Sequence, residues 1–158
     1  MRKNRNISIE AKFESNWMSK SLESLEKDYW GEPDYGSYLV TTTYKLRKKQ
    51  LKDYEIEDLR IMISENIGLK YLIPLAILIL DKDILAEGDF YEGDLFYSVI
   101  ESDKEYWEIE IDNWKKLCQV FEKNRSLLEN DYTTKDIRIA FTEFEKINKS
   151  LHNNKYAS

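Results

Sequence analysis

The stretch Glu57–Ile100, EDLRIMISENIGLKYLIPLAILILDKDILAEGDFYEGDLFYSVI, joins the most apolar run of the chain to the start of its most acidic run. The apolar run, Tyr71–Leu80, has ten residues, whereas a membrane-spanning helix needs about twenty. A helix that is apolar all round must be surrounded by other elements. We therefore predict a buried central helix, with Pro74 in its first turn, where a missing N–H does no harm.

Helical periodicity predicts further helices on both sides of this core. They are expected at residues 19–29, 34–49, 57–66, 94–102 and 103–129, with a last helix ending near residue 151. Gly68 is expected to adopt a left-handed conformation after the helix at 57–66, and the helix at 103–129 is expected to break near Asn124. Two Ser/Thr-x-x-Asp/Glu patterns, at 102–105 and 133–136, predict capping boxes.

The fold class that follows is all-α. Only 5 Gly and 2 Pro are present, too few for the many turns of an all-β fold. We predict a compact single-domain array of about six to seven helices over residues 19–151. Residues 1–18 are expected to form an N-terminal arm, with a possible short strand, and residues 152–158 a frayed C-terminal tail.

Bulk composition indicates the cellular setting. The single cysteine, Cys118, allows no internal disulfide, which suits a reducing compartment. The N-terminus lacks the apolar region of a signal peptide, so we expect a cytoplasmic protein. The basic residues at 45–52 are expected to be a solvated helix end rather than a nucleic-acid surface, because the chain carries a net charge of −6.

Charge is concentrated in residues 81–112, the acidic segment. It holds twelve carboxylates and two lysines, a net charge of −10, so the rest of the chain carries +4. Carboxylates this dense repel one another, and aromatic residues lie among them. Such a surface fits a basic protein partner, because carboxylates steer the encounter and aromatic side chains anchor it. A solvated loop with the aromatics in the core explains the same pattern, and charge alone leaves both interpretations open.

The candidate partner-binding residues are all in this segment. They are Asp81, Asp83, Glu87, Asp89, Tyr91, Glu92, Asp94, Tyr97, Glu101, Glu105, Tyr106 and Trp107.

Few residues are suited to catalysis or to a cofactor. The one histidine, His152, lies in the predicted tail, and Cys118 lies on an apolar helix seam. Acidic residues of the segment fall at several positions of a calcium-loop frame that starts at Asp81. That frame has Leu85 in place of a ligand and Ala86 in place of the required glycine. We therefore expect no catalytic residue, no cofactor and no metal site.

Five sequence blocks resemble a known family. They are WGEP at 30–33, LRKK at 46–49, EDLR at 57–60, NIGLKYLIP at 66–74 and LAEGDFYEGD at 85–94. Together they resemble the immunity proteins of bacterial contact-dependent growth inhibition (CDI) systems, over about residues 21–100.

The resemblance implies a partner. Such a protein binds the C-terminal toxin domain of a secreted exoprotein in the cytoplasm and neutralises it, usually by covering its active site. Many such toxins are nucleases, and a nuclease presents a basic groove to phosphates. We therefore expect a non-enzymatic inhibitor that acts as a monomer in a 1:1 complex, without direct contact to nucleic acid or membrane. The alternatives are a helical adaptor that binds another basic partner and a hydrolase that uses the carboxylates with a divalent metal.

Overall fold

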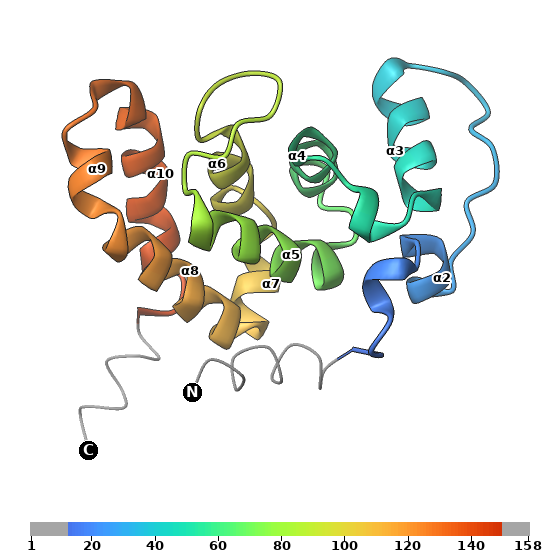
Figure 1. Ribbon diagram of the computed structural model, residues 1–158, viewed down its shortest axis with the longest axis horizontal. Coiled ribbons are helices and arrows are strands. Elements are labelled where there is room, and N and C mark those ends of the chain that lie inside the picture. The colour runs from blue at the N-terminus through green and yellow to red at the C-terminus, as the bar shows by residue number, and fades with distance from the viewer. Residues whose placement is uncertain (1–12, 150–158) are drawn as a thin grey trace. The chain divides into compact units, whose positions relative to one another are not determined.

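The computed structural model describes residues 13–149, and its architecture confirms the prediction of an all-α fold (Figure 1). Within those residues there are nine α-helices, three short 3-10 turns and no strand. The chain divides into two compact units, one ending at Asp58 and the other beginning at Leu59. The division falls inside α4 (Ile56–Ser64), where no feature of the sequence predicted a boundary.

The first unit is built from short elements. They are the 3-10 turn at Trp17–Ser19, α2 (Leu22–Glu26), α3 (Tyr38–Lys48) and the 3-10 turn at Leu51–Asp53. Ser21 caps α2, and Ser37 caps α3 by accepting a hydrogen bond from the Val40 N–H at 3.1 Å. Both helices are shorter than predicted. Lys27 ends α2 in a left-handed conformation, and α3 begins only after its serine cap.

Arg47 is an exception to the predicted solvated basic helix end. Its side chain is only 2% exposed, whereas Lys45, Lys48 and Lys52 are exposed. Its Nη1 donates to a Glu26 carboxylate oxygen at 2.6 Å and its Nη2 to the carbonyl of Asp28, also at 2.6 Å. The guanidinium also lies 4.3 Å from the centre of the Trp30 ring. Arg47 therefore fixes the chain that follows α2, including the start of the Trp-Gly-Glu-Pro turn.

The second unit is organised around α5. Its elements are α5 (Leu69–Lys82), α6 (Asp94–Ile100), α7 (Lys104–Ile109), α8 (Ile111–Lys123), α9 (Arg125–Glu129), the 3-10 turn Tyr132–Thr134 and α10 (Lys135–Lys146). Helix α5 packs against α6 and α8, which confirms the predicted buried helix. Pro74 is the sixth residue of α5 rather than part of its first turn. Gly68 is left-handed, as predicted, but it precedes α5, and Asn66, at φ 57°, follows α4.

The predicted long helix at residues 103–129 is three helices. The break near Asn124 is confirmed, and a second break occurs at Glu110, which ends α7 and precedes α8. The predicted capping box at 102–105 is wrong. Asp103 caps α7, while the Ser102 hydroxyl accepts a hydrogen bond from the Trp107 indole N–H at 2.9 Å. Because the Ser102 hydroxyl is buried and accepts a hydrogen bond from Trp107, it does not cap the helix.

The core of the second unit is aromatic. The rings of Phe121 and Phe141 stack with centroids 3.6 Å apart, and Phe96 lies beside both. Phe144 meets Trp107 edge to face at 4.8 Å and accepts, through its carbonyl, a hydrogen bond from the Trp114 indole at 3.0 Å. These contacts attach α10 to α6, α7 and α8.

Helix α10 lies where a last helix was predicted, with Ile137, Ala140, Phe141 and Phe144 buried. The capping box predicted at 133–136 is wrong, because Asp131 accepts from the Thr133 N–H at 2.9 Å and thereby caps the preceding 3-10 turn. The predicted end of the helix near residue 151, residues 1–12 of the predicted arm and the predicted tail lie outside the described residues. Among residues 13–149, no helix combines the length and apolarity needed to cross a membrane.

Gly93 allows a test of packing in the second unit, with Gly31 of the first unit as its control. Gly93 has φ +91°, and an added Cβ would lie 2.6 Å from the Cδ1 of Ile137. Gly31 has φ +73°, with nothing within 4 Å of an added Cβ. Alanine at either position costs about 1–2 kcal/mol in backbone strain. We expect Gly93→Ala to lower the free energy of unfolding by about 1–3 kcal/mol more than Gly31→Ala, because it also overpacks the core. Urea unfolding measures both variants, and equal losses would contradict this account.

Candidate functional site

The site predicted from charge centres on residues 83–93, here called the acidic loop, which joins α5 to α6 (Figure 1). Asp81 and Lys82, the first two residues of the acidic segment, lie in the last turn of α5 rather than in this loop. The Asp83 carboxylate accepts a hydrogen bond from the Leu85 N–H at 3.0 Å. Farther along, the Gly93 N–H donates to the Leu85 carbonyl at 3.2 Å, and Glu87 and Glu92 form an isolated antiparallel bridge. The acidic loop therefore folds back on itself with a defined backbone.

Asp94 fixes the conformation of this loop through hydrogen bonds to its backbone. Its side chain is buried, and its Oδ1 accepts from the Gly88 N–H at 2.7 Å, while its Oδ2 accepts from the N–H groups of Phe90 at 3.0 Å and Tyr91 at 3.4 Å. Arg60 on α4 lies opposite, with its Nε 4.0 Å from Oδ2. A buried carboxylate needs such donors and a cation. Asp94 is thus a structural residue beneath the surface rather than an exposed steering charge.

The acidic loop presents carboxylates together with aromatic rings. Glu87, Asp89 and Glu92 are exposed, Tyr91 is 46% exposed and Phe90 is 68% exposed. The guanidinium of Arg60 lies 4.3 Å from the centre of the Phe90 ring, which supports that ring from its inner side. Partial burial raises the pKa of the Tyr91 hydroxyl, so tyrosine stays neutral there. Phe90 was not among the predicted site residues, although its place between Asp89 and Tyr91 was a usable signal.

The structure separates the other predicted site residues. Asp81 is paired with Lys123, whose Nζ donates to the carboxylate at 2.6 Å and to the Asp81 carbonyl at 2.9 Å. Trp107 is fully buried in the core and offers no surface to a partner. Tyr97 is half-buried.

Three more predicted site residues lie around α7. Glu101 and Glu105 are exposed on either side of its start. Tyr106 is partly buried, and its hydroxyl accepts a hydrogen bond from the Asn113 side chain at 2.8 Å. Burial raises the pKa of the Tyr106 hydroxyl well above its usual range. Glu101 and Glu105 are therefore the members of this group that a partner can reach directly.

Within residues 13–149, no group of three or more His, Cys, Asp or Glu side chains is arranged to hold a metal ion. Cys118 is the free cysteine on α8, and burial, followed by the charges of Glu145 and Glu122, raises the pKa of its thiol to about 12. The reactive form of cysteine is the thiolate, so this thiol is poorly suited to act as a nucleophile at neutral pH.

Comparison with known proteins gives one result. A family model described as CDI immunity proteins matches residues 24–117. The matched range includes all of α3 to α7, the acidic loop and most of α8, and it ends before α9 and α10. No curated protein and no solved structure matches the chain.

The hydrogen bonds of Asp94 predict that replacing its carboxylate with an amide affects the acidic loop locally. Asp94→Asn removes the charge and one acceptor oxygen from a carboxylate that serves three backbone N–H groups. A hydrogen bond to a charged group contributes about 1.5–3 kcal/mol. We therefore expect the amide protons of Gly88, Phe90 and Tyr91 to exchange with solvent about tenfold faster or more. Hydrogen exchange followed by NMR measures this, and exchange rates equal to those of wild type would show that the loop does not depend on the carboxylate.

The Cys118 thiol is predicted to be unreactive in the folded protein. With a pKa raised to about 12, its thiolate fraction at pH 8 is far below that of an exposed cysteine. We expect alkylation by iodoacetamide at pH 8 to be at least about a hundredfold slower than in the urea-unfolded chain. Mass spectrometry of samples quenched at intervals follows the reaction. Equal rates in the folded and unfolded protein would contradict the assignment.

Proposed function

The chain belongs to the CDI immunity proteins, and from that premise we propose that it binds and neutralises its cognate toxin domain through the acidic loop. The toxin is the C-terminal domain of a CDI exoprotein, and the proposed target is a nuclease whose basic active-site groove the acidic loop covers. The observation that carries this proposal is the loop itself, which exposes Glu87, Asp89 and Glu92 around two aromatic rings on a fixed backbone.

Electrostatics supports a basic partner. The acidic segment has a net charge of −10 while the rest of the chain carries +4, and three of the exposed loop carboxylates lie within six residues of one another. A surface of this sign raises the rate at which a cationic protein is captured. A nuclease groove has the opposite sign because it neutralises phosphates. An acidic loop bound in that groove occupies the place of the phosphates. The immunity protein therefore competes with the nucleic-acid substrate of the toxin.

The aromatic side chains supply the part of the affinity that charge does not. Phe90 and Tyr91 are large exposed rings held on a loop whose backbone N–H groups are bonded to Asp94. Binding therefore orders little that is not already ordered, which lowers its entropic cost. Interface hot spots are enriched in tyrosine, and the rim of an interface is polar. We assign the anchoring role to these two rings and the steering role to Asp83, Glu87, Asp89 and Glu92.

The proposed interaction has a defined compartment, stoichiometry and mode of inhibition. The protein acts in the cytoplasm as a monomer in a 1:1 complex, and it inhibits by occupying the active site rather than by any chemistry of its own. The low thiolate fraction of Cys118 is consistent with a non-enzymatic inhibitor.

Charge reversal on the loop tests this function. Asp89→Lys combined with Glu92→Lys changes two exposed carboxylates and leaves the Asp94 contacts in place. We expect association with the purified cognate toxin domain to slow by about tenfold or more at low salt, with a smaller effect at high salt. In cells that express the toxin, the variant should protect less well than wild type.

A matched control has the same change in net charge elsewhere. Asp34→Lys with Asp53→Lys reverses two exposed carboxylates of the first unit, and this variant should bind the toxin as wild type does. If the loop variant protects cells fully and binds at the wild-type rate, the acidic loop is not the interface. If wild type does not bind the toxin domain at all, the adaptor alternative is favoured.

A further inference from the structure

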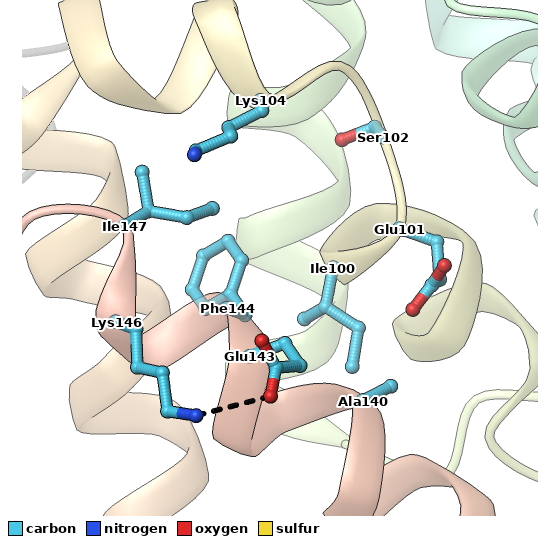
Figure 2. A pocket seen from close by; sticks show the side chains of 9 residues that line it. All are labelled: Ile100, Glu101, Ser102, Lys104, Ala140, Glu143, Phe144, Lys146 and Ile147. Atoms are coloured by element: carbon cyan, nitrogen blue, oxygen red, sulfur yellow. Dashed lines mark hydrogen bonds and ion pairs between the residues drawn. The ribbon is translucent and has the colours of Figure 1, made fainter.

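A groove in the second unit lies outside the acidic loop and has not been given a role above. It runs between the turn that joins α6 to α7 and the C-terminal half of α10 (Figure 2), and its volume is about 290 Å³. This volume is near the lower limit of the roughly 300–1,000 Å³ typical of small-molecule sites. It is therefore suited to one or two protein side chains rather than to a cofactor.

The floor of the groove is apolar and rigid. Ile100, Ala140, Phe144 and Ile147 line it, and the first three are nearly buried. The ring of Phe144 also meets Trp107 edge to face, and the backbone carbonyl of Phe144 accepts a hydrogen bond from the Trp114 indole N–H. A side chain placed in the groove would therefore extend the aromatic core at its edge, without any rearrangement of the floor.

The rim of the groove has one carboxylate that is not paired with a cation. Lys146 pairs with Glu143 at 3.1 Å, as Figure 2 shows, and Lys104 pairs with Glu108 at 3.8 Å. Glu101 is exposed on the other side of the groove, and it forms no ion pair within the described part of the chain. Because each rim lysine has a carboxylate on its own helix, the charge left for a partner is negative. The complementary ligand is an apolar side chain with a cation next to it.

The two walls of the groove differ in their relation to the family. Residues 100–104 lie inside the range that the family model matches, whereas residues 140–147 lie beyond its end at residue 117. The groove therefore combines a wall common to the family with a wall that the family model does not describe. A surface of that kind is suited to distinguishing one toxin from another, because part of it can differ while the fold is kept.

We propose that this groove is a second contact for the toxin domain, in which it receives an apolar toxin side chain while a neighbouring lysine or arginine of the toxin pairs with Glu101. This inference rests on the function proposed above and adds to it a specificity-determining contact from α10. The toxin side chain fills a preformed apolar pocket, which is the setting in which interface residues contribute most to affinity. The contact acts mainly on dissociation, whereas the acidic loop acts mainly on association.

Two variants test the groove, one at a buried position where the substitution can impair folding and one at an exposed position. Ala140→Leu fills its floor from α10, and Glu101→Lys reverses the charge of its rim at an exposed position. Their matched controls are Thr142→Leu, which adds the same side chain on the exposed face of α10, and Glu65→Lys, an exposed charge reversal elsewhere in the unit. Binding to the immobilised, purified cognate toxin domain gives association and dissociation rates for all four variants. Thermal unfolding identifies any variant that is not folded.

We expect Ala140→Leu to speed dissociation by about tenfold or more and Glu101→Lys to weaken binding by about fivefold or more, with both controls within about twofold of wild type. If Ala140→Leu does not fold, Glu101→Lys decides the question. Wild-type rates for the folded groove variants would overturn the inference. If the loop variant Asp89→Lys/Glu92→Lys is weakened at the same time, the proposed function stands without the groove. Absence of binding by wild type would instead remove the proposed function and the groove together.

Discussion

The buried carboxylate of Asp94 links the core of the second unit to its most acidic surface. One side chain at the start of α6 accepts hydrogen bonds from three backbone N–H groups of the acidic loop and lies opposite Arg60. Without these bonds, the loop would present repelling carboxylates on a backbone with many conformations. With them, the same carboxylates keep fixed positions around Phe90 and Tyr91. The conformation of the candidate interface therefore depends on a charge that is buried beneath it.

The aromatic core has a comparable role for the groove. Phe144 takes part in the stacked cluster of the second unit, and its side chain also forms part of the groove floor. Close-packed rings resist displacement, so the floor is preformed rather than induced. The acidic loop precedes the first residue of α6, and Ile100, the last residue of α6, lines the groove, so both surfaces adjoin the same helix. A partner that used both would combine fast capture with slow release.

Much of the fold was predictable from local patterns. The apolar run at 71–80 identified the buried helix, because a helix that is apolar on every side must be covered by other elements. The breaks were harder to predict. The pattern from Trp107 to Phe121 continues through Glu110 at helical spacing, yet the helix breaks there. Ser102 fitted a capping box, but it serves the buried indole of Trp107 instead, a contact made in the tertiary structure.

The amino-acid sequence by itself determined the all-α class, the buried helix, the concentration of negative charge at 81–112 and the resemblance to CDI immunity proteins. These properties follow from composition, periodicity and the order of short motifs. Only the tertiary structure decided which acidic and aromatic residues reach the surface. Asp94 and Asp89 look equivalent in the sequence. Asp94 is buried and accepts hydrogen bonds from three backbone N–H groups, whereas Asp89 is exposed. The physical reason is that burial and hydrogen bonding depend on groups brought together by folding, whereas net charge is a simple sum over residues.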